Sequence, residues 1–110
     1  MKAYTLLAVV MILSSSAAPA QWASGGTVTV TNVVLDSDQV YLEGSGMENP
    51  HRCAVGSRVI LGTTSAVRDR YLSVVMTALA AGLKIDIWVQ GCGDTPWGTA
   101  EIAYYLNLHK

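Results

Sequence analysis

The alternation of apolar and polar positions predicts five strands and one helix. Between the third and fourth strands the period changes from two residues to that of a helix, over Val67–Leu83. The chain order is therefore three strands, one helix and two strands. The predicted strands are Thr27–Thr31, Gln39–Glu43, Arg58–Leu61, Lys84–Val89 and Glu101–Leu108.

The first strand carries an irregularity at Asn32. After the regular alternation of Thr27–Thr31, the consecutive residues Val33–Leu35 are all apolar, so that both faces of the strand would carry apolar side chains. A slip of one residue exchanges the two faces of a strand, so a bulge or strong bend is predicted here. The run Asp36-Ser37-Asp38 is typical of a turn, and it joins this strand to Gln39–Glu43 as a hairpin.

The helix has capping residues at both ends. Thr63, Thr64 and Ser65 are candidates for the N-cap, and Gly82 is placed as the C-terminal cap. The apolar positions between them form one stripe, which we expect to face the core. The stripe consists of Val67, Tyr71, Val74, Val75, Ala78 and Leu79.

The stretch WVQGCGDTPWG, residues 88–98, is predicted to turn the chain between the last two strands. Val89 ends the first of these strands, and the turn residues Gly91, Gly93, Asp94 and Pro96 follow it. In the last strand, alternation puts Ile102, Tyr104, Leu106 and Leu108 on one face and Glu101, Ala103, Tyr105 and Asn107 on the other.

This order of elements predicts a fold that is mainly β with one helix. We expect residues 21–110 to form a single domain, an OB-fold-like five-stranded antiparallel barrel of order β-β-β-α-β-β. Closure removes the edges that an open sheet would expose. A sandwich would need more strands, and a ferredoxin-like fold would need a second helix.

Residues 1–20 are predicted to be a signal peptide. Lys2 precedes the apolar run Leu6–Leu13, and Ala18-Pro19-Ala20 forms a cleavage site of the A-x-A type. The run is shorter than the roughly 20 residues that span a bilayer, so no membrane span is predicted. We expect export, with cleavage after Ala20, to the periplasm or the medium.

The charge balance argues against nucleic acid as a partner. The whole chain has seven basic and eight acidic residues, and removal of Lys2 with the leader leaves a net charge of −2. The basic residues form no patch or run, whereas a nucleic-acid-binding domain normally concentrates them on one face.

Cys53 and Cys92 are the only cysteines, and in an exported protein they are expected to form a disulfide. The bridge would close a loop of about 40 residues, which contributes roughly 4 kcal/mol in the chain-entropy model. A zinc site with His51 and His109 is disfavoured because the four residues lack metal-ligand spacing. No metal and no cofactor are predicted.

The segment RDRYLSVVMTALAAGLKIDIWVQGCGDTPWGTAEIAYYLNL resembles a group of small exported bacterial proteins without an assigned function. The shared pattern is a helix ending near Gly82, a strand, a Gly-Cys turn and a last strand. This group is in turn distantly similar to the B subunits of AB-type toxins, notably that of subtilase cytotoxin. The resemblance covers about residues 58–108. It implies an OB-fold, export, glycan binding and ring-shaped oligomers, but it assigns no glycan-binding residue in this chain.

The chain shows no catalytic set of residues. His51, with Glu48 and Arg52 nearby, is better explained as part of a solvated loop beside the disulfide. Gly91-Cys92-Gly93 lacks the Gly-Lys-Ser/Thr continuation of a phosphate-binding loop. We therefore expect a protein that is not an enzyme, and a small hydrolase using His51 is the least favoured function.

The candidate ligand-binding residues are aromatic and lie around the last two strands. Trp88 and Tyr105 fall outside the predicted core faces of neighbouring strands, so they can share one outer surface with Asp86 and Glu101. Packing, a subunit interface and a ligand platform are three alternative uses of that surface. Trp22 and Tyr41 are interpreted as packing residues. The candidate ligand-binding residues are Trp88, Trp97, Tyr105 and Asp94.

These observations favour an exported, non-enzymatic binding domain. Carbohydrate is the leading ligand class, because the distant resemblance to toxin B subunits implies glycan binding and because the C–H faces of sugars stack on aromatic rings. The alternative is a periplasmic inhibitor or accessory protein that acts through a protein–protein surface. The predicted partner is thus a glycan or another protein, and a homo-oligomer is compatible with either function.

Overall fold

The computed structural model describes residues 22–110. The predicted signal peptide and its cleavage site lie outside the described residues. The elements are β1 (Ala23–Asp36), β2 (Gln39–Ser45), β3 (Val55–Leu61), α1 (Ser65–Ala81), β4 (Lys84–Thr95) and β5 (Gly98–His109). Their order is the predicted one. The described part of the chain contains no helix that is long and apolar enough to cross a membrane.

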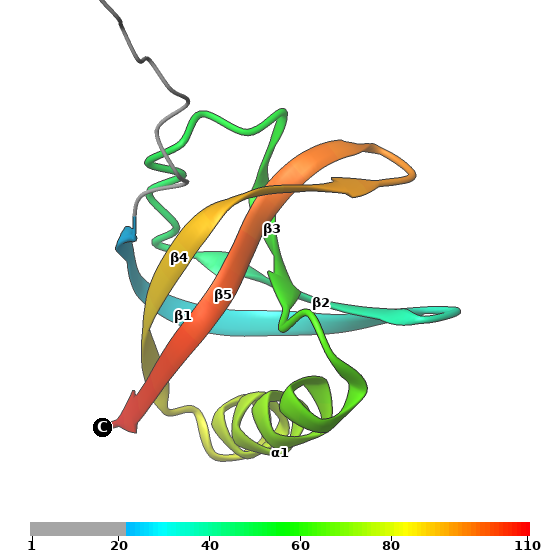
Figure 1. Cartoon of the computed structure of the whole chain (residues 1–110). Helices are drawn as coiled ribbons and strands as arrows, with labels where there is room; N and C mark the ends of the chain where they lie inside the picture. The colour runs from blue at the N-terminus through cyan, green and yellow to red at the C-terminus, as the bar shows by residue number, and fades with distance from the viewer. Residues whose placement is uncertain (1–21) are drawn as a thin grey trace, which may run out of the picture.

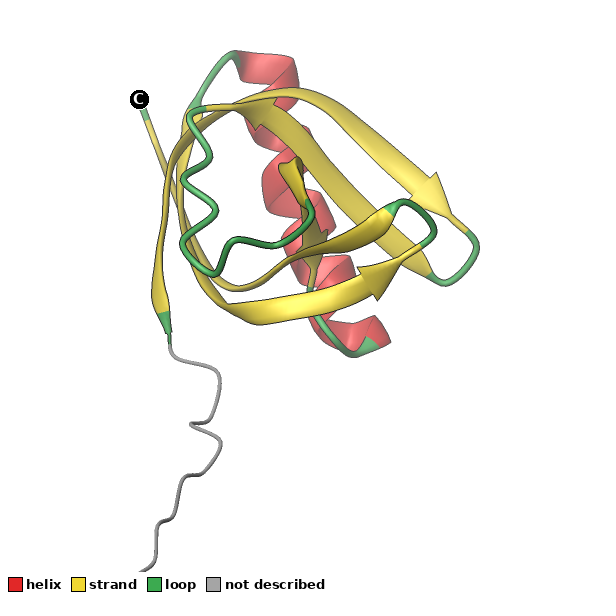
Figure 2. Cartoon of the chain, turned by 90° about the horizontal axis from the view of Figure 1, so that it is seen from above, coloured by secondary structure: helices red, strands yellow, loops and turns green. Residues whose placement is uncertain are grey.

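The five strands close into a barrel in the order β1-β2-β3-β5-β4 (Figure 1). This confirms the predicted OB-like fold. Four of the five strand pairs are antiparallel, whereas the pair β3–β5 is parallel. The helix crosses one end of the barrel, and the loop of residues 46–54 lies at the opposite end (Figures 1 and 2).

The long strand β1 pairs with two neighbours and bends between them. Its first half pairs with β4 and its second half with β2, and the register with β2 shifts between Val30 and Asn32. The predicted bulge is therefore present, with Thr31 as the unpaired residue, next to the irregularity predicted at Asn32. The predicted turn is also present, with Ser37 in the left-handed region at φ 50°.

Helix α1 begins and ends at predicted caps. The Thr64 side chain accepts a hydrogen bond from the Val67 backbone N–H, and Gly82 ends the helix in the left-handed conformation at φ 68°. The buried residues of the helix are Val75 and Ala78. Leu79, expected on the core-facing stripe, is instead 38% exposed.

The core fills the barrel and the space under α1. Its buried side chains include Val28, Leu42, Leu61, Ile85 and Val89. A smaller cluster around Tyr41, Ile60 and Ala100 fills the region near the two hairpins. Burial of Tyr41 confirms its interpretation as a packing residue.

The expected turn within residues 88–98 is mostly strand. β4 continues through Gly91, Cys92 and Gly93 to Thr95, and only Pro96 and Trp97 connect it to Gly98 of β5. The register shifts between Val89 and Cys92, and Gly91 lies in that bulge at φ 143°. A glycine suits such a backbone because it has no Cβ. The prediction that Val89 ends the strand was therefore wrong.

Candidate functional site

Trp88 and Tyr105 face each other across β4 and β5 on the outside of the barrel. They are cross-strand partners, and their side chains are 41% and 47% exposed. Together with Tyr104 they line a shallow pocket of about 270 Å³. The ring of Trp22 lies 4.3 Å from that of Tyr104, centroid to centroid. Four aromatic side chains therefore gather at one place.

Tyr104 joins this group because β5 is irregular at that residue. Trp88 pairs with Tyr105 but Val89 pairs with Ala103, so Tyr104 is an extra residue in the ladder. The hydroxyl of Tyr71, on α1, donates a hydrogen bond to the Tyr104 carbonyl oxygen. The helix thereby holds the bulge that presents Tyr104.

A row of polar side chains continues from the aromatic group on the same outer face. Asp86 is two residues from Trp88 on β4, and it pairs in register with Asn107 of β5 and Thr27 of β1. The Thr27 hydroxyl donates to Asp86 Oδ1 at 2.7 Å, and His109 Nε2 lies 3.0 Å from the same oxygen. Three strands thus fix the position of this carboxylate.

These contacts shift the pKa values of both ionisable partners. The hydrogen bonds from Thr27 and then from His109 lower the pKa of Asp86 below its ordinary value. The hydrogen bond to Asp86 raises the pKa of His109 above its ordinary value. At neutral pH the row therefore presents a carboxylate that accepts hydrogen bonds.

We call this surface the aromatic–polar face, formed by Trp88, Tyr104, Tyr105, Asp86, Asn107 and His109. Exposed aromatic rings beside hydrogen-bonding groups that are already held in place suit a ligand with both C–H and hydroxyl surfaces. Contact with the Asp86 carboxylate would need little rearrangement, because Thr27 and His109 already hold it.

Trp97 belongs to a different surface, at the tip of the β4–β5 hairpin. Its ring lies 4.0 Å from the guanidinium carbon of Arg58 and 5.2 Å from the Tyr41 ring. Glu43 forms an ion pair with Arg58, and the hydrogen bond from Arg58 lowers the pKa of the Glu43 carboxyl. Trp97 is therefore held by a cation–π contact and an edge-on aromatic contact.

Asp94 lies near the same hairpin tip and not beside Trp88. It lines a hollow together with Asp36 and Asp38 of the β1–β2 turn. The structure therefore brings together Trp88 and Tyr105 but separates them from Trp97 and Asp94. Spacing along the chain did not reveal this division, because the extension of β4 to Thr95 carries Asp94 and Trp97 away from Trp88.

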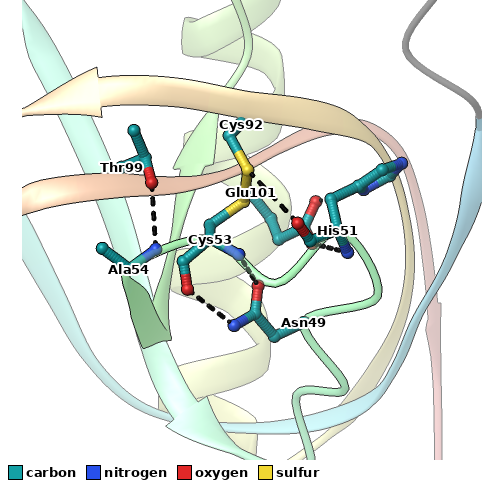
Figure 3. A network of polar contacts seen from close by, with 7 residues as sticks. All are labelled: Asn49, His51, Cys53, Ala54, Cys92, Thr99 and Glu101. Carbon is teal, nitrogen blue, oxygen red and sulfur yellow. Dashed lines mark hydrogen bonds and ion pairs between the residues drawn. A yellow bond between two sulfur atoms is a disulfide. The ribbon is translucent and has the colours of Figure 1, made fainter. Parts of the chain in front are cut away.

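Glu101 was expected on the outer surface beside Trp88 and is instead buried, with 2% of its surface exposed. Its two carboxylate oxygens contact His51. Oε2 accepts a hydrogen bond from the His51 backbone N–H, and Oε1 lies 2.7 Å from His51 Nδ1 (Figure 3). The expectation failed because the bulge at Tyr104 changes which positions of β5 face inward.

The His51–Glu101 pair is part of a cross-linked corner at the end of the barrel. The predicted disulfide Cys53–Cys92 is present, and the Cys92 sulfur lies 3.8 Å from the His51 carbonyl oxygen (Figure 3). Asn49 exchanges two hydrogen bonds with the backbone of Cys53. These contacts fasten the loop of residues 46–54 to β4 and β5.

The sequence signal for this corner was weak, because a glutamate within an alternating strand resembles an exposed residue. An imidazole whose Nδ1 faces a carboxylate is oriented as in many catalytic dyads. Here the same carboxylate also accepts the His51 backbone N–H, which is a structural contact.

Among residues 22–110 no group of three or more His, Cys, Asp and Glu side chains is placed to hold a metal ion. No protein-family model matches the chain, and no curated protein or solved structure is significantly similar to it.

Proposed function

We propose that this protein is a binding domain that holds carbohydrate on the aromatic–polar face. The observation that carries the proposal is the exposed cross-strand pair Trp88–Tyr105, with the polar row of Asp86, Asn107 and His109 beside it. The proposal includes that the protein is exported and that it is not an enzyme.

Carbohydrate fits this combination for a physical reason. One face of a pyranose ring presents C–H groups that pack on an aromatic ring, while its hydroxyl groups need donors and acceptors at the ring edge. The Trp88 and Tyr105 rings supply the first, and Asp86 with Asn107 supplies the second. Thr27 and His109 already fix Asp86, so binding loses little side-chain freedom there.

Two features of the sequence agree with the proposal. The predicted signal peptide would bring the domain to a compartment where glycans are exposed. The resemblance of residues 58–108 to toxin B subunits adds glycan binding as an expectation, although it assigns no residue of the aromatic–polar face.

Trp88 and Trp97 provide a matched test. Trp88→Ala removes a ring from the aromatic–polar face, whereas Trp97→Ala removes a similarly exposed ring from the hairpin tip. Both variants and the parent protein are screened on a glycan array, and each hit is measured by calorimetry. We expect Trp88→Ala to weaken binding by tenfold or more, about 1.4 kcal/mol, and Trp97→Ala to leave it unchanged.

Three outcomes would overturn the proposal. These are an array without any hit, a hit that both variants bind normally, or a hit lost only in Trp97→Ala. If no glycan binds but a protein partner is found whose binding requires Trp88, the result would support the alternative function of an inhibitor or accessory protein.

A further inference from the structure

On the outside of the barrel, side chains of three neighbouring strands form rows that run across β1, β4 and β5. The residues of each row pair in register, and neighbouring rows are two residues apart on β4 and on β5. The rows are Ser24–Trp88–Tyr105, Thr27–Asp86–Asn107 and Thr29–Lys84–His109. The first row carries the aromatic rings and the other two carry polar groups. The aromatic–polar face therefore extends over about 14 Å along the strands, which is more than one sugar ring can span.

Trp22 lengthens this face at the aromatic end. In the chain it comes two residues before Ser24, on the side of the first row that is away from the polar rows. Tyr104 lies on the same side, and the centroids of the Trp22 and Tyr104 rings are 4.3 Å apart. Trp22 is nevertheless 66% exposed, so packing on Tyr104 leaves most of its surface open to a ligand.

The pocket in the aromatic row is too small to enclose a long ligand. It has a volume of about 270 Å³ between Trp88, Tyr104 and Tyr105, whereas pockets that enclose drug-sized ligands have roughly 300–1,000 Å³. A longer ligand must therefore continue along the open face, over Trp22 in one direction and over the polar rows in the other.

The charged groups of the polar rows balance one another. The Asp86 carboxylate lies two residues from Lys84 on β4, and His109 Nε2 is 3.0 Å from Asp86 Oδ1. An anionic sugar would gain attraction at Lys84 but meet repulsion at Asp86, and the reverse holds for a cationic one. The hydroxyl groups of Thr27 and Thr29 add uncharged hydrogen-bonding groups to the same rows. The rows therefore suit a neutral ligand that is rich in hydroxyl groups.

We infer that the aromatic–polar face and Trp22 together hold a neutral, linear oligosaccharide that lies along β4 and β5. This inference rests on the proposed function, to which it adds the class of carbohydrate and one further ligand-contacting residue, Trp22. One sugar unit packs on Trp88 and Tyr105, and the next unit on one side packs on Trp22. A unit on the other side offers hydroxyl groups to Asp86 and Asn107. Affinity therefore rises with chain length, because each added unit meets further side chains.

A chain-length series measures this dependence. The probes are β-1,4-linked oligomers of glucose, of mannose and of N-acetylglucosamine, which are neutral, extended chains, and calorimetry gives the affinity of each from the monomer to the tetramer. For at least one of these sugars we expect the tetramer to bind at least tenfold more tightly than the monomer. Failure of all three series to show this gain, while another glycan on the array binds through Trp88, would overturn this inference alone. Absence of binding by any glycan would overturn the proposed function as well.

Variants of Trp22 test its contact with the ligand. Trp22→Ala should weaken binding of the tetramer at least fivefold more than binding of the monomer, whereas Trp22→Phe, which keeps an aromatic ring, should retain part of the gain with length. Trp97→Ala removes a tryptophan outside the face and should bind every probe as the parent protein does. A gain with length that survives in Trp22→Ala, or an equal loss at every length, would overturn the assignment of Trp22. Circular dichroism verifies that each variant is folded.

Discussion

Glu101 Oε1 lies 2.7 Å from Nδ1 of His51, and Glu101 Oε2 accepts the His51 backbone N–H. One buried carboxylate of β5 thus contacts both the backbone N–H and the ring of a single loop residue, which lies fifty positions earlier in the chain. Because Glu101 is buried, with only 2% of its surface exposed, water does not readily replace these partners. The pair fixes the loop of residues 46–54 against the barrel.

Glu101→Gln should lower the free energy of unfolding by about 1–3 kcal/mol, because a neutral amide with a single acceptor oxygen replaces the carboxylate that accepts the His51 backbone N–H and contacts the His51 ring. Urea unfolding followed by tryptophan fluorescence measures the change. The exposed Glu48 lies in the same loop and provides the control, since Glu48→Gln is expected to change stability by less than about 0.5 kcal/mol. Equal effects of the two substitutions would contradict the structural role of Glu101.

Removal of the disulfide should cost about 4 kcal/mol, since Cys53 and Cys92 are 39 positions apart and the bridge restricts the unfolded chain. The comparison is urea unfolding of the oxidised protein against the variant with both cysteines replaced by serine. A difference below about 1 kcal/mol would show that the corner is held by its hydrogen bonds alone.

The Asp86–His109 pair should contribute to stability within a defined pH window. The pKa of His109 is raised, so its contribution is complete below the ordinary value of 6.5 and is lost as the pH rises through the folded-state pKa. The pKa of Asp86 is lowered, so its contribution is present above 3.8 and is lost as the pH falls through the folded-state pKa. The pair is therefore fully effective between these two ordinary values.

NMR titration of the His109 ring tests this directly. In Asp86→Asn the His109 pKa should fall toward its ordinary value, whereas Asp69→Asn, on the exposed side of α1, should leave it unchanged. An unaltered His109 titration in Asp86→Asn would show that the two side chains do not interact in solution.

Gly93→Ala should destabilise the barrel by about 1–3 kcal/mol through overpacking. A Cβ at this position would lie 2.8 Å from Cδ1 of Ile102 and 3.0 Å from Cδ1 of Ile60. Ile102→Val removes the nearer methyl group, so the double variant should lose less stability than the sum of the single variants. Strict additivity in chemical unfolding would contradict this account.

The fold was predictable because its signals are local. Alternation marked the strands, and its interruption at Asn32 indicated the bulge that the structure has at the neighbouring Thr31. Thr64 and Gly82 marked the ends of the helix. The disulfide followed from the number of cysteines. These features depend on neighbouring residues and hardly on the rest of the structure.

The site was predicted only in part, because it depends on long-range pairing. The cross-strand position of Trp88 and Tyr105 followed from their place on neighbouring strands. The burial of Glu101 did not, since it results from the bulge at Tyr104 that changes which positions of β5 face inward. The separation of Trp97 from Trp88 did not either, since it results from the extension of β4 to Thr95. Glycines in residues 88–98 resembled turn residues although they belong to a bulged strand.

The disulfide also affects how the protein would respond to proteolysis. Cys53 and Cys92 enclose β3, α1 and most of β4, including Arg68 and Arg70 on the surface of the helix. A trypsin-like protease that cuts once at these arginines would leave the two fragments covalently joined. The nicked molecule would keep its mass apart from one added water, and the two fragments would separate only under reducing conditions.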